Sequence, residues 1–408
     1  MIGALSVSSM SGVCSGAKDP VGDVSSIKGE LNVQSEYFIG DFLSLHGAKI
    51  GRRDDVKQIM TYHSDNNDWS ITSESKDALI TSLLGLLPAE GAKIHNRVFL
   101  EAVRDWYCGL DSGSKIDNAV AAKDHLDRKG HNIARMILEA NYDLGGSSVR
   151  VLDVGGNDGI LTSNVAYHLG QSLNVPVQPY VLEIETGVSW DHNSNTVSAA
   201  DNNKNEPVKT IYYDGRDMSS GRVFGPEDNN PLADGRGFDC AMYQHSLHHF
   251  PSPEIQQESL KQIFGLLNDG GVLTISEHGS ALGSSELDLM HMMTEVYSDL
   301  HRDPQMSVNE LEERYNAYVE RETPANYFSQ ESLRDMARKA GFTPVSVTGI
   351  SERTERTYSM TFVKNAESIL ERHRDLNALL DSDALKADVT KFETKSIYAG
   401  VRSLDGVF

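Results

Sequence analysis

The sequence predicts a doubly wound α/β protein with a seven-stranded, mostly parallel sheet, and two observations support this prediction. From Ser148 to about Lys364, short apolar runs alternate with segments of helical periodicity, which is typical of a parallel sheet covered by helices. The first of these runs leads into a glycine-rich turn, within VLDVGGNDGI at residues 151–160. Such sheets bind ligands at the carboxyl ends of their strands, so this turn marks the edge where a functional site is expected.

Seven segments are expected to form the strands of this sheet. They are VRVLDVG, QPYVLEIE, VKTIYYDG, FDCAMYQ, GVLTISEH, PVSVTGI and YSMTFVKN. Helical segments such as GILTSNVAYHLGQSL and ESLKQIFGLLNDGG separate most of them. The last two strands have no helix between them, so we expect them to pair as an antiparallel hairpin at the edge of the sheet.

Pattern shifts along the chain predict four regions. Residues 1–30 are rich in Ser and Gly and are expected to be flexible, whereas helical patterns that end at Pro and Gly predict a helical N-terminal domain or cap over residues 31–147. The sheet domain is expected at 148–365, with a helical insertion at 279–326. A tail at 366–408 is expected to begin as a helix.

The composition of the 408-residue chain limits which classes of protein it can belong to and which partners it can bind. The cysteines Cys14, Cys108 and Cys240 form no CxxC or Cys/His pattern, which argues against a disulfide scaffold and a structural zinc site and favours a cytoplasmic location. No stretch approaches the roughly 18 apolar residues of a membrane span, so we expect a soluble protein without a membrane partner. The formal net charge of −22 argues against nucleic-acid binding, although a local basic groove is still compatible with it. The sequence is also compatible with a homo-oligomer.

Acidic residues stand at the predicted carboxyl ends of the first three strands. Asp153 precedes the glycines of the first turn, Glu183 ends the second strand and Asp214 ends the third. The turn lacks the Gly-Lys-Ser/Thr of a P-loop and the G-x-G-x-x-G spacing of a dinucleotide site. Carboxylates suit a cationic ligand better than a pyrophosphate, and S-adenosylmethionine, which carries a sulfonium, an amino-acid tail and a ribose, is such a ligand.

A series of motifs between Val149 and Lys364, about half of the chain, resembles the class I S-adenosylmethionine-dependent methyltransferases. The motifs are VLDVGGNDG, VLEIE, YYDGRDM, FDCAMYQHSLHHF, LLNDGGVLTISEH and YFSQESLRDMARKAGF, in the family's order. The resemblance implies an enzyme with S-adenosylmethionine as its cofactor. It also implies cofactor contacts: the methionine part with Asp153, Gly155, Asn157 and Gly159, the ribose with Glu183, the adenine amine with Asp214, and the edge of the methyl-transfer site with Gln244.

Two positions depart from the family's pattern. Asn157 stands where the family usually has glycine, which is tolerable because Asn accepts left-handed backbone conformations better than most residues. The interval from Gly159 to Glu183 is slightly long, so Glu185 competes for the ribose. We favour Glu183, because it alternates correctly with Val181 along the strand.

Histidines and a glutamate follow the fourth and fifth strands, in QHSLHHF and SEH. Methyl transfer uses a base only where the nucleophile must lose a proton, and an imidazole or a carboxylate is a suitable proton acceptor. LHHF resembles a motif that often shapes a helix start in small-molecule methyltransferases, which weakens the case for His248 and His249, so His245 and His278 rank first. The candidate catalytic residues are His245, His249, Glu277 and His278.

The region after the fifth strand allows two further interpretations. A metal site of Glu277, His278, Asp288 and His291 is an alternative because the last two share a helix face, but such helical pairs are commonly surface groups, and we expect no metal. The insertion is expected to cover the acceptor site. Its methionines, Met290, Met292 and Met293, favour core packing, and the functional alternative is that they line an apolar acceptor pocket with Tyr297.

The leading hypothesis is an enzyme that methylates an oxygen or nitrogen of a small-molecule or other polar acceptor. The alternative enzyme is an RNA methyltransferase. The Lys-Asp-Lys-Glu set that ribose 2′-O-methyltransferases use is missing, so the alternative is a cap methyltransferase of the guanine-N7 type, which needs no side-chain base. A non-catalytic assembly or scaffold protein that retains the methyltransferase fold is the alternative of another class. The intact cofactor positions, such as Gly155, Glu183 and Asp214, argue against it.

Overall fold

The structure is a computed structural model of the chain, and a defined set of residues is described. They are 31–47, 53–61, 71–88, 92–110, 119–141, 143–144, 146–184, 207–218, 221–223, 232, 234–278, 284–322, 326–348 and 357–366. The predicted flexible segment 1–30 lies outside them, as does the predicted tail apart from residue 366.

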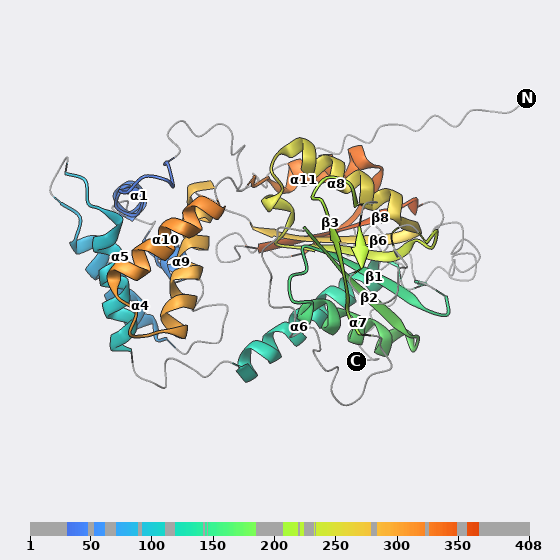
Figure 1. Cartoon of the computed structure of the whole chain (residues 1–408), viewed down its shortest axis with the longest axis horizontal. Helices are drawn as coiled ribbons and strands as arrows, with labels where there is room; N and C mark the ends of the chain where they lie inside the picture. The colour runs from blue at the N-terminus through green and yellow to red at the C-terminus, as the bar shows by residue number, and fades with distance from the viewer. Residues whose placement is uncertain are drawn as a thin grey trace, which may run out of the picture.

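Within the described residues, eight strands form one sheet in the order β4-β3-β2-β1-β5-β6-β8-β7 (Figure 1). Their bounds are β1 Val149–Val154, β2 Val177–Ile184, β3 Lys209–Tyr213, β4 Arg222–Val223, β5 Phe238–Gln244, β6 Leu267–His278, β7 Phe342–Thr348 and β8 Thr357–Lys364. All seven predicted strands are present, and the two-residue β4 is an addition at the edge. β8 is antiparallel to both β6 and β7, so the predicted antiparallel pairing of the last two strands is confirmed.

The strand order reverses at β1, which lies between β2 and β5. Val154, the last residue of β1, pairs with Leu182 on β2 and with Tyr243 on β5, all three strands being parallel. The carboxyl ends of these strands therefore lie side by side. In doubly wound sheets this switch point is where ligands bind.

Helices cover both faces of the sheet, each through its own buried apolar cluster (Figure 1). Their bounds are α6 Ala119–Ala140 and α7 Ile160–Leu173 on one face, and α8 Pro253–Leu266 and α11 Gln330–Ala340 on the other. Ile133 and Val165 pack on one side of the sheet, and Leu260 and Leu333 pack on the other. None of the described helices is both long and apolar enough to cross a membrane.

The remaining helices form a separate helical lobe beside the sheet (Figure 1). They are α1 Phe38–Phe42, the π-helix η2 Leu43–Gly47, α2 Arg53–Met60, α4 Ser73–Gly85, α5 Asn96–Gly109, α9 Ser284–Arg302 and α10 Val308–Glu322. The first five precede β1 and the last two follow β6, yet they share one apolar core that contains Met290, Met292 and Met293. Tyr297 on α9 donates a hydrogen bond to the carbonyl oxygen of Met60 across 2.6 Å. The insertion thus packs on the N-terminal helices, and the domain boundaries at 31–147 and 148–365 stay a prediction.

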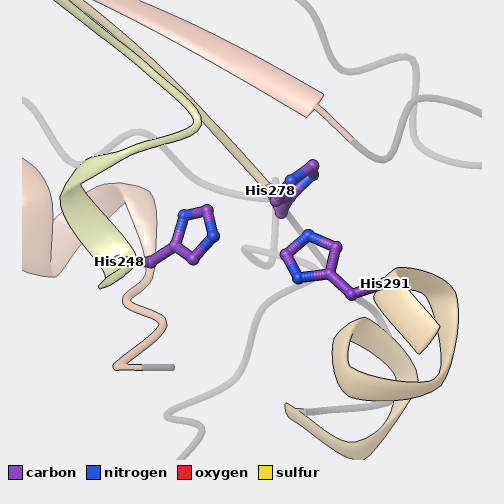
Figure 2. Close-up of side chains that lie close together, drawn as sticks. All are labelled: His248, His278 and His291. Carbon is purple, nitrogen blue, oxygen red and sulfur yellow. The ribbon is translucent and has the colours of Figure 1, made fainter. Parts of the chain in front are cut away.

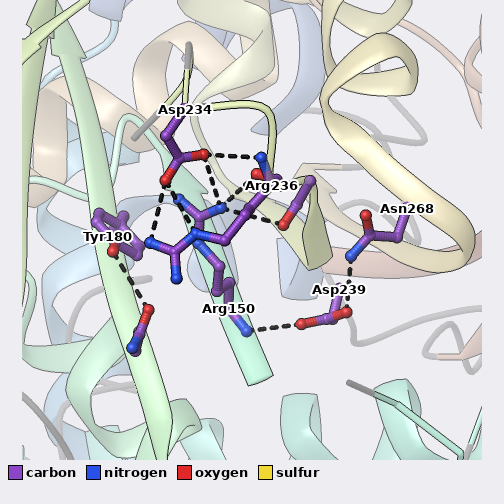
Figure 3. Close-up of polar contacts among 8 residues, drawn as sticks. Arg150, Tyr180, Asp234, Arg236, Asp239 and Asn268 are labelled. Carbon is purple, nitrogen blue, oxygen red and sulfur yellow. Dashed lines mark hydrogen bonds and ion pairs between the residues drawn. The ribbon is translucent and has the colours of Figure 1, made fainter. Parts of the chain in front are cut away.

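A buried arginine fastens the amino ends of the central strands (Figure 3). The backbone N–H of Arg150 on β1 donates to Asp239 Oδ2 on β5 across 2.8 Å, and its guanidinium lies 3.3 Å from Asp234 Oδ1. The guanidinium also donates to the carbonyl oxygen of Arg236 and lies 4.5 Å from the centre of the Phe238 ring. These contacts serve the fold, and the opposite, carboxyl edge of the sheet carries the candidate site.

Candidate active site

The turn after β1 is built on three residues with left-handed backbone. The φ angle is +71° at Gly155, +50° at Asn157 and +76° at Gly159. Glycine adopts this region freely and Asn more readily than other side chains, so Asn157 has the conformation expected of it from the sequence. Gly159 then caps α7, so the turn leads directly into a helix N-terminus whose first N–H groups can bind a polar ligand.

Glu183, at the end of β2, contacts this turn directly. Its Oε1 accepts a hydrogen bond from the backbone N–H of Asn157 across 2.5 Å. Burial raises the pKa of Glu183, and the hydrogen bond from Asn157 opposes that rise. The carboxylate therefore stands beside the turn, where the resemblance expects the ribose, while the competing Glu185 lies outside the described residues.

Asp153 lies buried beneath the same turn. Its Oδ2 accepts a hydrogen bond from the hydroxyl of Thr162 across 2.7 Å, whereas its Oδ1 is buried without a hydrogen-bond partner. Burial raises the pKa of Asp153 to about 7, and the Thr162 bond moderates the rise. This carboxyl group therefore changes its charge near neutral pH, next to the predicted position of a cationic ligand.

Asp214 follows β3 and organises its own turn. Its Oδ1 accepts from the backbone N–H groups of Arg216 and Asp217, both at 2.8 Å, and these two bonds hold the pKa of Asp214 below its usual value. The carboxylate is exposed and ionised at the carboxyl edge of the sheet. Its predicted role toward the adenine amine stays a prediction.

The loop after β5 packs against the turn after β1. A methyl group added at Gly155 would lie 2.7 Å from Ser246 Cβ, and Ser246 donates to the carbonyl oxygen of Val154 across 2.5 Å. His245, between Gln244 and Ser246, has a φ of +59°, which is uncommon for a residue with a bulky side chain and is typical of functional sites. The two loops thus form one wall.

Near the ends of β1 and β5, beside these two loops, buried polar atoms without partners match what S-adenosylmethionine would require. They include Asp153 Oδ1 and both side-chain amide atoms of Gln244. A buried polar group is costly unless a partner satisfies it, and a ligand with an ammonium and a sulfonium group, hydroxyls and ring nitrogens supplies such partners. The residues on the two loops therefore fit this cofactor.

A buried histidine–glutamate pair lies immediately beyond Gln244. Nδ1 of His248, in the 3₁₀ helix η5 (Leu247–His249), is 2.6 Å from Glu277 Oε2 near the end of β6. The other oxygen, Oε1, accepts from the backbone N–H groups of Leu247 and His248 at 3.1 and 3.3 Å. A carboxylate that accepts this bond places a hydrogen on Nδ1, and Nε2 of His248 is buried without a hydrogen-bond partner.

His248 belongs to a cluster of imidazoles (Figure 2). One ring nitrogen from each of His248, His278 at the end of β6 and His291 on α9 lies within 4.8 Å of the others. His245 stacks on His278 with 4.3 Å between ring centres. Burial holds the pKa values of His245, His278 and His291 well below the usual value, so these rings are neutral at pH 7.

The structure places His249 and Asp288 outside the group of three histidines whose ring nitrogens lie together. His249 is exposed, and its ring lies tilted against that of His248, with 4.1 Å between ring centres. Among the described residues, the group that could hold a metal consists of His248, His278 and His291 and does not include Asp288. Glu277, the other carboxylate of the predicted metal set, contacts His248 instead. The predicted catalytic roles of His245, His249, Glu277 and His278 stay predictions.

Two residues of the site were missed in the sequence. Tyr327 stacks on His248, with 5.1 Å between ring centres, and its hydroxyl lies 3.1 Å from His291 Nδ1. Lys129 on α6 is near enough to Asp153 and Glu277 for their charges to raise its pKa, although burial lowers that pKa overall. Lys129 lies outside the family motifs, and Tyr327 opens the motif YFSQESLRDMARKAGF but was given no role there; the packing of α6 and of the segment before α11 brings both residues here.

Comparison with solved structures returns methyltransferases at low similarity. A CurJ carbon methyltransferase is 15% identical with a TM-score of 0.42, covering 82% of this chain and 81% of that chain. Magnesium protoporphyrin IX methyltransferase from Synechocystis PCC 6803 with bound SAH is 15% identical with a TM-score of 0.34, covering 64% and 93%. An O-methyltransferase family protein from Burkholderia thailandensis is 14% identical with a TM-score of 0.37, covering 79% and 98%. No curated protein matches the sequence significantly.

A family sequence model matches the chain over a long continuous range. The sequence model described as "Methyltransferase domain" matches residues 121–347, which is more than half of the chain. The matched residues include most of α6, the turn after β1, the histidine cluster and the insertion. The chain therefore belongs to this family and is a class I methyltransferase that uses S-adenosylmethionine as its cofactor.

Proposed function

We propose that the chain transfers the methyl group of S-adenosylmethionine to an oxygen or nitrogen of a small polar acceptor, which binds against the histidine cluster. The observation that carries this proposal is the pair of buried ring nitrogens without hydrogen-bond partners, Nε2 of His248 and Nδ1 of His278. They lie beyond the turn after β1, residues 155–159, which we call the cofactor turn. A site that buries such atoms favours a ligand with polar groups that satisfy them.

The residues around the turn would bind and orient the cofactor. The left-handed turn and the start of α7 offer backbone N–H groups to the methionine part, and the carboxylates of Asp153 and Glu183 face a ligand that carries positive charge. S-adenosylmethionine supplies the methyl group, whose carbon–sulfur bond breaks with the electron pair left on sulfur. Positioning of the acceptor in line with that bond is the protein's main contribution to the rate.

The histidine cluster would then act on the acceptor. A hydroxyl or a protonated amine must lose a proton to become a good nucleophile, and unprotonated imidazole nitrogens are groups that promote this loss. The rings of His245 and His278 are neutral at pH 7 because burial disfavours their charged form. Glu277 orients His248 so that its lone pair faces the cluster rather than the carboxylate.

The histidine cluster is buried, which supports the proposal that the acceptor is a small molecule. His248 and Glu277 are 0% and 2% exposed, and α9 of the helical lobe brings His291 over them. A large RNA or protein acceptor would have to insert one protruding group into this buried space. The net charge of −22 also disfavours an RNA acceptor.

Methyl-transfer assays test this proposal. The purified chain is incubated with methyl-labelled S-adenosylmethionine and, separately, with pools of small hydroxyl or amine compounds, with capped RNA and with a protein extract. We expect label in the small-molecule pools, strongly reduced in His278→Asn and retained in Glu258→Gln, an exposed position on α8. Transfer to capped RNA or protein alone would contradict the proposed acceptor class.

A further inference from the structure

We propose that His248, His278 and His291 bind a divalent transition metal of the Zn²⁺ class. Their ligating nitrogens lie within 4.8 Å of one another and come from three elements, η5, the end of β6 and α9 (Figure 2). Imidazole is a preferred ligand of Zn²⁺, Fe²⁺, Co²⁺ and Ni²⁺, and three histidines with an open position form a known catalytic zinc arrangement.

The separation of the nitrogens is suitable for this class of ion. With metal–nitrogen bonds of about 2.0–2.1 Å in tetrahedral geometry, the nitrogens would lie about 3.4 Å apart. Nitrogens that lie up to 4.8 Å apart would have to approach by at most about 1.4 Å, a movement that rotation of the side chains would supply. Nε2 of His248 and Nδ1 of His278 have no hydrogen-bond partner, so no bond of theirs has to break.

Two of these rings are already held through Nδ1. Nδ1 of His248 lies 2.6 Å from Glu277, and Nδ1 of His291 lies 3.1 Å from the hydroxyl of Tyr327. Metal-binding histidines typically hydrogen-bond through their other nitrogen to a carboxylate or another polar group, which fixes the ring and increases its basicity. The carboxylate of Glu277 also offsets part of the metal's charge in this buried space.

The segment that carries Tyr327 is tied to the turn that carries His248. The backbone N–H of Asn326 donates to the carbonyl oxygen of His248 across 2.7 Å. The side-chain amide of Gln256 donates to the carbonyl oxygens of Leu247 and Asn326 at 3.1 and 2.8 Å. Rigid support of this kind keeps ligands near the required geometry before an ion binds.

The inferred ion would sit between the sheet and the helical lobe. Its role in the reaction rests on the proposed function: an open coordination position would take the acceptor's oxygen or nitrogen. The ion would lower the pKa of a bound hydroxyl, whose proton would pass to water, and the bond from that oxygen to the methyl carbon would form as the carbon–sulfur bond of the cofactor breaks, with its electron pair left on sulfur. His248 would then hold the ion and would not accept the proton itself.

Metal binding to the full chain tests the site without reference to activity. After removal of metals with a chelator, the chain is titrated with Co²⁺, followed by visible absorption, and with Zn²⁺, followed by calorimetry. We expect one ion per chain and at least 100-fold weaker binding in His278→Asn and in His291→Asn. His301→Asn, an exposed histidine on the same helix as His291, should bind as the wild type does.

Three results would overturn the inference. One is the absence of saturable binding of either ion to chain whose circular dichroism shows it folded. Another is unchanged binding in both His278→Asn and His291→Asn. The third is full methyl transfer by metal-free chain, which would overturn the role inferred for the ion in the reaction. Calorimetry with S-adenosylmethionine on the same metal-free sample separates the two proposals, because cofactor binding without metal binding contradicts only the metal site.

Discussion

His248 Nδ1 and Glu277 Oε2 lie 2.6 Å apart in a buried pair that joins the loop after β5 to the end of β6. Two backbone N–H groups hold the other carboxylate oxygen, so the pair has a single orientation. Because Nδ1 donates to the carboxylate, the lone pair of Nε2 faces the histidine cluster. This relationship links the fold of the sheet to the chemistry proposed for the acceptor.

Glu277→Gln should lower kcat by about 10- to 100-fold, the usual effect of removing a carboxylate that orients a reactive histidine. The amide keeps the size of the side chain but loses its charge and no longer fixes the tautomer of His248. The KM for S-adenosylmethionine should change little, because Glu277 lies beyond the cofactor turn. Steady-state kinetics on Glu277→Gln beside Glu258→Gln measures this, and equal kcat values would refute the role of the pair.

Cofactor affinity should rise with pH through the pKa of Asp153, which burial raises to about 7. An ionised carboxylate attracts the cationic cofactor, so binding should strengthen by about tenfold between pH 6 and pH 8. Asp153→Asn should lack this increment, while the cofactor's own amine titrates equally in both proteins. Calorimetry at several pH values checks this, and parallel curves for the two proteins would show that Asp153 does not contribute.

The same raised pKa predicts a pH dependence of stability. Between 3.8 and about 7, the folded chain keeps a proton on Asp153 that the unfolded chain has released. The contribution of this group to stability is therefore complete below 3.8 and is lost as pH rises through 7. The stability difference between Asp153→Asn and the wild type should shift in favour of the variant from pH 4 to pH 8 in urea unfolding, and a difference that does not change with pH would contradict this prediction.

Gly159→Ala should destabilise the chain by about 1–2 kcal/mol, because a side chain at φ +76° is strained. The added methyl group would also lie 2.9 Å from Val208 Cγ1, so either Val208 or the cofactor turn must shift. Asn157→Gly is the matched control, because glycine accepts the φ of +50° at that position. Thermal unfolding and cofactor titration of both variants test this, and a Gly159→Ala protein that matches wild type in both would rule out the strain.

Tyr297→Phe should reduce the free energy of unfolding by about 1 kcal/mol, since it removes a buried hydrogen bond to the Met60 carbonyl oxygen. The bond joins the insertion to the N-terminal helices in one core. Urea denaturation measures the loss, and an unchanged midpoint would show that the contact adds nothing to the joint core.

The sheet and its cofactor turn could be predicted from sequence because both have local signatures. Apolar runs that alternate with helices gave the strands, and the left-handed preference of Asn157 is a property of that residue. The shared core of the helical lobe has no such signature, because residues before β1 meet residues after β6. The same holds for the site, where His291, Tyr327 and Lys129 reach His248 and Asp153 from distant segments.

Calorimetric titration of the folded chain with S-adenosylmethionine tests the central claim most directly. We expect saturable binding at one site per chain, with affinity strongly reduced in Glu183→Ala and unaffected in Glu258→Ala. Absence of saturable binding to folded wild-type chain, or equal affinity in Glu183→Ala, would contradict the placement of the cofactor at the turn after β1.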